Sequence, residues 1–154
     1  MNRIKLTKLD NIQLNIGCGN QREAGFIGLD KGDYGQEIVW DIRKGIPLPD
    51  NSCFCLMADS VLEHIQLNED FVLVMNECLR VLKPQGKFEI IVPFWKSEIA
   101  IKDPTHCRFF HEMTFTYLQK ENPWEYGFDK RWKILECKQL PGNNNLHVIL
   151  IADK

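Results

Sequence analysis

Short apolar runs, separated by polar segments rich in glycine and proline, dominate the first part of the chain and predict buried β-strands. Three such runs lie at about 12–17, 26–30 and 37–40, and a longer one occupies 53–58. Continuous apolar runs of this length are typical of strands that are covered on both faces. About ten residues separate the first two runs, fewer than a parallel crossover with a full helix requires. We therefore predict a single helical turn or an irregular connection there.

A helical pattern follows in the middle of the chain. From Phe71 to Leu82, apolar side chains recur at the spacing of one helix face. Asn68 is the predicted N-cap of this helix, because its side-chain oxygen can accept from the free backbone N–H groups of the first turn. The segment Lys83–Gly86 contains a proline and a glycine and is predicted to end the helix.

The last part of the chain predicts further strands. Phe88–Val92 is another apolar run of buried-strand length, and two final runs at about 132–139 and 146–152 flank a turn rich in glycine and asparagine. That turn predicts an antiparallel hairpin. Residues 1–11 are polar and are expected to form a loose arm or an edge strand. Parallel strands first and a hairpin last predict an α/β fold with a mixed sheet.

Composition narrows the class of protein. The chain has 154 residues, of which 44% are hydrophobic and 26% charged, as is usual for one globular domain, here expected to span residues 1–154. The net charge of -2 gives no electrostatic reason to expect binding to nucleic acid. Residues 1–5 lack the apolar core of a signal peptide, and no apolar run reaches membrane-spanning length. We therefore expect a cytoplasmic protein without membrane association.

Six cysteines occur in the chain without any Cys-x-x-Cys pair. Paired disulfides are not expected in a chain that has no secretory signal. Cys53, Cys55, Cys78 and Cys137 lie within apolar patterns, and we interpret them as small core residues.

The strand at 12–17 ends in a turn that is suited to a ligand. Gly17 and Gly19 are one residue apart, and glycine in such a turn permits positive φ angles and the close approach of a ligand. Asp30 closes the next strand, where a carboxylate can accept from two neighbouring ribose hydroxyls at once. A turn residue or a helix cap is the alternative for Asp30. Because ligands of open α/β sheets bind outside the carboxyl ends of the strands, these two strand ends predict a nucleoside cofactor.

Five motifs in this order resemble the class I S-adenosylmethionine-dependent methyltransferases, in particular small bacterial members of unassigned substrate. The motifs are Leu14–Gly19, Asp30, Pro47–Ser52, Val61–Ile65 and Leu79–Gly86. The resemblance covers about residues 12–118 and implies a Rossmann-like α/β fold. The implied sheet has seven strands and is mostly parallel, with a C-terminal hairpin whose antiparallel strand lies between two parallel ones. The short spacing of the N-terminal runs predicts that the helices are trimmed in that half of the chain.

The same resemblance implies S-adenosylmethionine as the cofactor and S-adenosylhomocysteine as its product. The cofactor-binding residues that it implies are Asn15, Gly17, Cys18, Gly19, Asp30, Asp41, Ile42, Asp59 and Ser60. In this family the glycine turn approaches the methionine and ribose portions of the cofactor. The acid at the end of the second strand, here Asp30, is expected to accept hydrogen bonds from the ribose hydroxyls. Asp41 and Ile42 are expected at the adenine, and Asp59 and Ser60 near the methionine amino group.

The chain departs from the family pattern at several positions. Asn15 stands where an acidic residue is usual, Cys55 replaces an aspartate that is often found in the fourth strand, and Gln85 replaces the first of two glycines. The short front half also lacks room for the helix that normally covers one face of the sheet.

The segment 94–128 follows the strand at 88–92 and is expected to face the substrate. It contains Asp103, His106 and His111, which are the candidate catalytic residues. Methyl transfer is an in-line displacement at an activated carbon, so the protein aligns the acceptor and supplies a base if the acceptor is protonated. An imidazole oriented by a carboxylate suits that task. The alternative is that His106 hydrogen-bonds to the backbone and only holds the loop.

The predicted function is methyl transfer from S-adenosylmethionine to a small acceptor, because few residues lie outside the core fold. One alternative is a non-catalytic cofactor-binding or scaffold domain that works with a partner protein. Another is a nicotinamide-dependent oxidoreductase, which the lack of a Gly-x-Gly-x-x-Gly motif disfavours. No metal is expected, since the histidines, acids and cysteine of the substrate-side segment show no recognised ligand spacing. A homodimer is a further expectation, with a second subunit over the trimmed face of the sheet.

Overall fold

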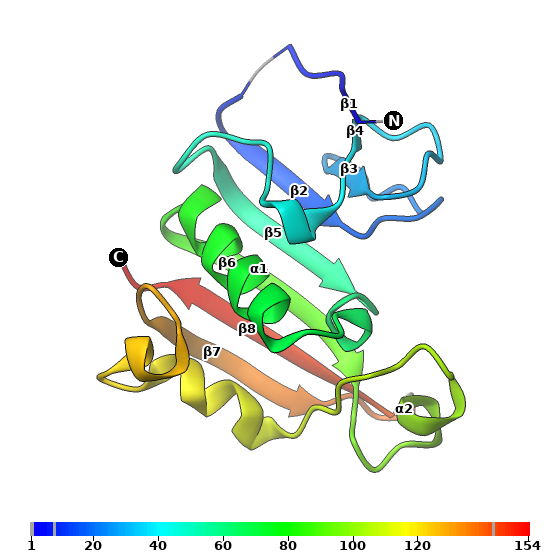
Figure 1. The fold of residues 1–154 in the computed structure, drawn as a ribbon, viewed down its shortest axis with the longest axis vertical. Coiled ribbons are helices and arrows are strands. Elements are labelled where there is room, and N and C mark those ends of the chain that lie inside the picture. Colours follow the sequence, from blue (N-terminus) through cyan, green and yellow to red (C-terminus); the bar gives the residue numbers. More distant parts are fainter. Residues whose placement is uncertain (1, 8, 143) are drawn as a thin grey trace.

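The computed structural model describes residues 2–7, 9–142 and 144–154, and these residues form one sheet of eight strands with helices against it (Figure 1). The strands are β1 (Arg3–Ile4), β2 (Ile12–Ile16), β3 (Ile27–Asp30), β4 (Ile38–Val39), β5 (Cys53–Asp59), β6 (Leu82–Pro93), β7 (Trp132–Gln139) and β8 (Asn145–Ala152). The helices are α1 (Asn68–Val81), α2 (Glu98–Lys102) and the short 3-10 helices η1 (Ile42–Lys44), η2 (Leu62–His64), η3 (Glu112–Gln119) and η4 (Pro123–Tyr126). Of these described helices, none has both the length and the apolar character needed to cross a membrane.

The strand order across the sheet is β1-β4-β3-β2-β5-β6-β8-β7. Within this order β4, β3, β2, β5 and β6 run parallel to one another, and β8 runs antiparallel between β6 and β7. This arrangement confirms the predicted mostly parallel sheet with a C-terminal antiparallel hairpin. β1 pairs antiparallel with β4, so the described sheet has one edge strand more than the seven strands expected. Within the predicted arm and the hairpin turn, residues 1, 8 and 143 lie outside the described part.

The connections in the N-terminal half are short and irregular, as predicted. Residues 17–26, which join β2 to β3, are all described and contain no helix. This connection consists of turns that are closed by backbone hydrogen bonds. In one of them the Gln21 N–H group donates to Cys18 O at 2.9 Å. Between β4 and β5 the described chain forms only the single turn of η1. The predicted trimming of the helices is therefore confirmed.

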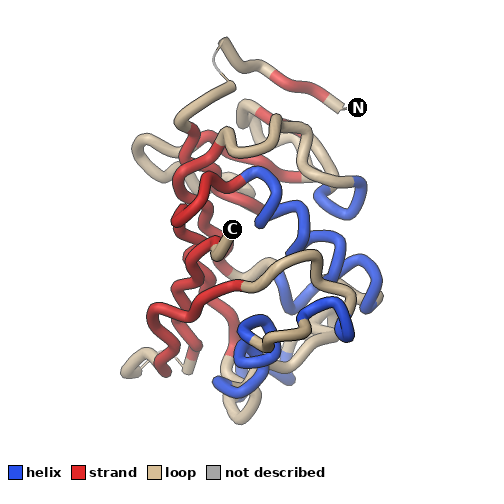
Figure 2. Tube along the Cα trace, turned by 90° about the vertical axis from the view of Figure 1, so that its left-hand side faces the viewer, coloured by secondary structure: helices blue, strands red, loops and turns tan. Residues whose placement is uncertain are grey.

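The core lies between the sheet and α1. Figure 2 shows the helical segments on one side of the strands. Val74, Met75 and Cys78 of α1 are fully buried, as are Leu56 and Phe88 on the strands. Burial of apolar surface contributes about 25 cal/mol per Å², so this face supplies the main stabilising contribution. No described helix covers the opposite face of the sheet, and the second subunit expected there stays a prediction.

The N-cap of α1 differs from the prediction. Leu67, in extended conformation, precedes the helix, and Asn68 is the first helical residue. The Asn68 Oδ1 atom accepts a hydrogen bond from Arg108 Nη2 at 3.0 Å. The predicted cap is wrong because the loop that carries Arg108 lies against this turn and uses the amide oxygen.

The strand β6 begins earlier than predicted. The helix ends one residue before Leu82, which already pairs with Cys53 of β5. Lys83–Gly86 therefore belongs to an irregular start of the strand, where the register shifts and Gln85 adopts a φ of 63°. The buried strand predicted at Phe88–Val92 is present as the later part of β6.

Candidate functional site

The carboxyl ends of β2, β3, β4 and β5 meet at one edge of the sheet, because these strands are parallel neighbours. A cavity of about 330 Å³ opens there, which is within the usual range for small-molecule sites. Of the predicted cofactor residues, Gly17, Asp30, Asp41, Ile42 and Ser60 line this cavity, whereas Asn15, Cys18, Gly19 and Asp59 do not. The cavity is also lined by His64, and by Trp40 and Val61, for which the sequence predicted no role.

The turn after β2 depends on Gly17 for its packing. Gly17 adopts a φ of 66°, and a Cβ atom there would lie 2.4 Å from Val61 Cγ2. A side chain at this position therefore requires Val61 to move. Gly19 has a φ of 51°, but a Cβ atom added to it would meet no atom within 4 Å. Its backbone is thus open to a ligand.

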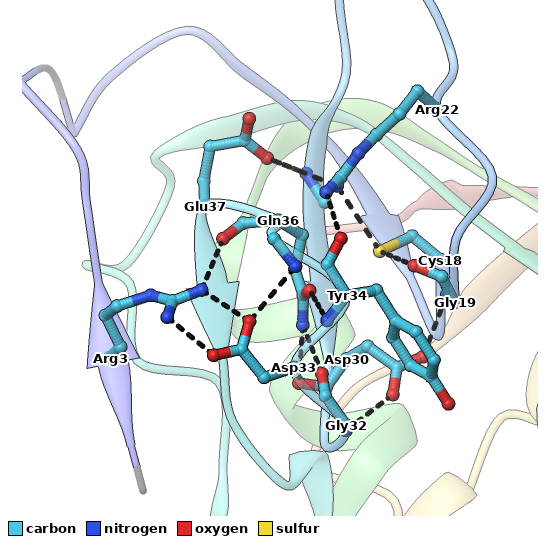
Figure 3. Close-up of polar contacts among 12 residues, drawn as sticks. Arg3, Cys18, Gly19, Arg22, Asp30, Gly32, Asp33, Tyr34, Gln36 and Glu37 are labelled. Carbon is cyan, nitrogen blue, oxygen red and sulfur yellow. Dashed lines mark hydrogen bonds and ion pairs between the residues drawn. The ribbon is translucent and has the colours of Figure 1, made fainter.

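Asp30 is half-buried at the carboxyl end of β3. Its Oδ2 atom accepts from the Gly19 N–H group (2.9 Å) and its Oδ1 atom from the Gly32 N–H group (2.8 Å), as Figure 3 shows. An ionised carboxylate has about four acceptor positions, so two remain for the hydroxyl groups of a ligand.

The loop after Asp30 is held by a network of hydrogen bonds (Figure 3). Gln36 is fully buried, and its amide group donates to the carbonyl oxygens of Asp30 and Gly32. Arg3 donates two hydrogen bonds to Asp33, at 2.6 and 2.7 Å, and these lower the pKa of Asp33 to about 2. The Asp30 carboxylate is therefore held in place before a ligand binds, which reduces the ordering that binding requires.

The carboxylate of Asp41 is engaged by its own loop. It accepts from the Arg43 N–H group (3.1 Å), which caps η1, and it forms an ion pair with Arg43 Nη2 at 2.7 Å. The hydrogen bonds from the Arg43 side chain lower the pKa of Asp41. Beside it, Ile42 and Trp40 also line the cavity, and Trp40 is oriented by a hydrogen bond from Nε1 to Gly45 O (2.9 Å). These two side chains offer an apolar surface that suits a purine ring.

The remaining predicted cofactor residues differ in their access to the cavity. Ser60 lines it with a φ of 57°, a conformation that is uncommon outside glycine and is often found at ligand sites. The Ser60 hydroxyl donates to Asp59 Oδ1 (2.9 Å), and Asp59 itself is exposed. Asn15 is buried within β2. Cys18 is buried beside the turn, and this burial raises the pKa of its thiol.

A second group of polar side chains lies next to the cavity. His64, at the end of η2, lines the cavity, and its ring centroid is 4.8 Å from that of His106. His106 Nε2 lies 3.7 Å from Asp103 Oδ2 and 4.0 Å from Glu63 Oε1. The structure thus brings the predicted residues Asp103 and His106 together and adds Glu63 and His64 from a distant part of the sequence.

Glu63 is a functional candidate that sequence reasoning missed. Its side chain is fully buried, and neither carboxylate oxygen has a hydrogen-bond partner among the described residues. Burial raises the pKa of Glu63 to about 7. Its main-chain carbonyl accepts from the N–H groups of Cys107 and Arg108, which holds their loop against η2. The one signal in the sequence was the acid beside a histidine within the motif Val61–Ile65.

The contacts of His111 place it apart from this group. Its ring centroid lies 5.9 Å from that of Trp95 and 6.2 Å from that of Phe94. His111 Nδ1 accepts from the Met113 N–H group at 3.1 Å, so this side chain caps η3. A catalytic role for His111 stays a prediction.

The cavity residues fit a nucleoside cofactor that has no pyrophosphate, such as S-adenosylmethionine. Asp30 supplies acceptor positions for ribose hydroxyls, and Trp40 and Ile42 supply an apolar wall. The glycine turn leads into an irregular connection, whereas pyrophosphate binding uses a turn that opens a helix.

Comparisons with known proteins agree with this geometry. Residues 29–90 match a family sequence model described as a methyltransferase domain. A search of curated proteins found no significant match.

Several solved structures have a similar fold. A SAM-dependent methyltransferase from Aquifex aeolicus has a TM-score of 0.65 and 16% identity, with 94% of this chain and 85% of that chain covered. For an S-adenosylmethionine-dependent methyltransferase from Mesorhizobium loti the TM-score is 0.62 and the identity 15%, with 95% and 93% covered. The [4+2]-cyclase SpnF has a TM-score of 0.65 and 13% identity, with 96% and 76% covered. At these identities the similarity shows the fold.

Proposed function

We propose that the chain is a class I S-adenosylmethionine-dependent methyltransferase and that it transfers the methyl group of this cofactor to a small acceptor bound beside His64. This proposal makes the chain an enzyme with S-adenosylmethionine as its cofactor. The residues that match the methyltransferase domain, 29–90, include Asp30 and His64. The proposal also covers the size and binding place of the acceptor and the roles of individual residues.

The observation that carries the proposal is the position of Asp30. Its carboxylate lies in the cavity at the end of β3 and has two acceptor positions left after binding the N–H groups of Gly19 and Gly32. Two acceptor positions on one side chain match the two neighbouring hydroxyls of a ribose. We therefore assign the ribose of S-adenosylmethionine to Asp30.

The other parts of the cofactor follow from this placement. The adenine lies against Ile42 and Trp40, beyond Asp30 along the sheet edge, where the carboxylate of Asp41 is held by Arg43. The methionine portion lies over the glycine turn toward Ser60, which lines the cavity on its other side.

The acceptor lies between the cofactor and the group around His106. His64 lines the cavity and also contacts His106, so it connects the two places. Methyl transfer to a hydroxyl or an amine breaks one C–S bond, forms one C–O or C–N bond and releases one proton. His106 and the neighbouring Asp103 are the proposed acceptors of that proton. The net charge of -2 favours a small molecule over a nucleic acid.

Thermal unfolding with added ligands tests the cofactor site. S-Adenosylhomocysteine at a hundredfold its Kd should add about 2.7 kcal/mol to the free energy of unfolding, a rise of roughly 5–11 °C in Tm. S-Adenosylmethionine should act in the same way, and NAD should not. Asp30→Ala should lose most of the shift because both acceptor positions for the ribose are gone.

Glu37→Ala is the matched control for Asp30→Ala. Glu37 also accepts from a backbone N–H group on β3, that of Gly28 (2.8 Å), but it does not line the cavity. Its loss should lower Tm without reducing the ligand shift. An unchanged ligand shift in Asp30→Ala would contradict the assignment of the ribose to Asp30.

Labelled cofactor tests the size of the acceptor. The protein is incubated with methyl-labelled S-adenosylmethionine and a cell extract, which is then separated into small molecules, RNA and protein. Label that depends on the enzyme should appear in the small-molecule fraction. Label confined to RNA or protein would refute the proposed acceptor class and leave the cofactor assignment intact.

A further inference from the structure

The side chain of Glu63 is buried without a partner. It is 0% exposed, and no group among the described residues donates a hydrogen bond to either carboxylate oxygen. An ionised carboxylate that is buried without hydrogen bonds has lost its hydration, and this raises the free energy of the folded state. A bound cation or a proton removes that cost. His106 Nε2 lies 4.0 Å from Glu63 Oε1.

The neighbours of the two histidines determine which ring nitrogen carries hydrogen. His106 Nδ1 lies 3.3 Å from Ala100 O, which can only accept, so Nδ1 is the donor. Thr105 Oγ1 donates its hydrogen to Asp103 Oδ1 at 2.7 Å and therefore accepts from His64 Nδ1 at 3.1 Å. In their neutral forms both histidines then keep a lone pair on Nε2. Histidines that bind metals usually donate their other ring N–H group in this way.

The spacing of these atoms is too wide for a shared proton. His106 Nε2 lies 4.0 Å from Glu63 Oε1 and 3.7 Å from Asp103 Oδ2, whereas a hydrogen bond requires about 3.2 Å or less. A tetrahedral metal ion with bonds of about 2.0–2.2 Å holds its ligand atoms about 3.3–3.6 Å apart, which is wider than a hydrogen bond. Ligand atoms of Glu63, His64 and His106 all lie within 4.8 Å of one another. Shortening the longest of these separations by about 1.5 Å or less brings the three atoms to the spacing around one ion.

We propose that Glu63, His64 and His106 bind one divalent transition-metal ion, for example Zn²⁺, at the edge of the cofactor cavity. Two imidazoles and one carboxylate are a donor set for Zn²⁺ or Fe²⁺, whereas Mg²⁺ and Ca²⁺ favour oxygen ligands. Glu63 is the buried ligand, on the side of the site that faces the core. His64 is exposed and lines the cavity. Three protein ligands leave a coordination position open, as in catalytic metal sites.

This ligand set explains why the sequence predicted no metal. The histidine and acids of the substrate-side segment show no ligand spacing by themselves, because the other two ligands come from η2, about 40 residues earlier in the chain. The backbone bonds from Cys107 and Arg108 to the Glu63 carbonyl bring the two segments together.

The consequence for the acceptor rests on the proposed function. A hydroxyl or amine bound at the open position loses its proton more readily, since the ion stabilises the resulting lone pair. With Nε2 bound to the ion and Nδ1 carrying hydrogen, His106 no longer accepts the proton, which passes to Asp103 alone; Asp103 Oδ2 lies 3.7 Å from His106 Nε2. The lone pair then attacks the methyl carbon, and neutral S-adenosylhomocysteine leaves with the electrons of the C–S bond. The expected acceptor is a small molecule with a hydroxyl or amine group that binds metals.

Metal binding is measured in the absence of the cofactor. The protein is dialysed against EDTA and titrated with Zn²⁺ in a calorimeter, where the wild type should bind one ion per chain. Glu63→Gln and His106→Asn should each weaken binding roughly a hundredfold or more, beyond the loss typical of outer-shell partners. His106→Asn keeps a donor that can reach Ala100 O but has no Nε2 atom. Glu63→Gln removes an unpaired buried charge, so it should not lower the Tm of the metal-free protein.

Two matched variants separate this site from binding by other side chains. His111→Asn removes an imidazole that lies at η3, and Cys107→Ser removes an exposed thiol next to the cluster. Both should bind Zn²⁺ as the wild type does. Failure of the wild type to bind Zn²⁺ would overturn the proposal. So would equal Zn²⁺ binding by the wild type, Glu63→Gln and His106→Asn, or displacement of the ion by millimolar Mg²⁺.

Binding of S-adenosylhomocysteine distinguishes this proposal from the proposed function. It is measured on the metal-free protein, because the cofactor assignment rests on Asp30 and not on the metal ligands. Binding of S-adenosylhomocysteine without any binding of Zn²⁺ overturns the metal site alone. Specific binding of Zn²⁺ without S-adenosylhomocysteine supports the metal site and overturns the cofactor assignment.

Discussion

Replacement of Gly17 by alanine tests the packing of the turn that borders the cavity. The residue adopts a φ of 66°, which costs an alanine about 1–2 kcal/mol. The new Cβ atom would also lie 2.4 Å from Val61 Cγ2 and 3.2 Å from Val61 Cγ1, so Val61 would have to move. Forcing a methyl group into a filled space costs a further 1–3 kcal/mol or so. The free energy of unfolding should therefore fall by about 2–5 kcal/mol.

Gly142→Ala is the control that isolates the contact with Val61. Gly142 adopts a φ of 79°, but a Cβ atom there would meet nothing within 4 Å. Gly142→Ala places an alanine at a positive φ and lowers the entropy of the unfolded chain, as Gly17→Ala does. It introduces no contact with another side chain. In chemical denaturation, Gly17→Ala should be less stable than Gly142→Ala by about 1–3 kcal/mol.

A double variant identifies the atoms that clash. Val61→Ala removes both Cγ atoms, so Gly17→Ala should cost less when it is introduced into the Val61→Ala background. The coupling energy should reach about 1 kcal/mol or more. A difference between Gly17→Ala and Gly142→Ala below about 0.5 kcal/mol, or a coupling near zero, would refute the reasoning.

Two further predictions concern α1. Arg80 hydrogen-bonds to Glu77 (2.7 Å) and lowers the pKa of that carboxyl. Glu77 therefore adds stability above its unfolded pKa of about 4.3, and this contribution is lost as pH falls through its lower folded value. Urea unfolding should show a smaller loss of stability between pH 6 and pH 3 for Glu77→Gln than for the wild type; equal losses would contradict this. Lys154 Nζ donates to the carbonyl oxygens of Leu79 (2.5 Å) and Arg80 (3.0 Å) at the end of α1, so Lys154→Met should lower the free energy of unfolding by about 1 kcal/mol. The exposed Lys133→Met should leave it unchanged, and equal effects of the two variants would refute the capping role.

The sequence by itself determined the features that depend on neighbours along the chain. The apolar runs predicted β2, β3, β5 and the later part of β6, because strands that pack on a core are short runs rich in apolar residues. The spacing between β2 and β3 predicted the missing helix, since a crossover helix needs a minimum length of chain. Gly17 and Asp30 were identified because their positions follow directly from strand ends.

Tertiary structure alone decided which distant side chains meet. Glu63 and His64 come together with His106 only because the loop after α2 folds back and hydrogen-bonds to the Glu63 carbonyl. Arg108 of the same loop donates a hydrogen bond to the side-chain oxygen of Asn68, so this oxygen does not cap α1 as expected. Local patterns report burial and turns, which involve residues close in sequence. Such patterns do not report which two loops lie together at one edge of a sheet. The cluster of Glu63, His64 and His106 beside the cavity depends on that arrangement of loops.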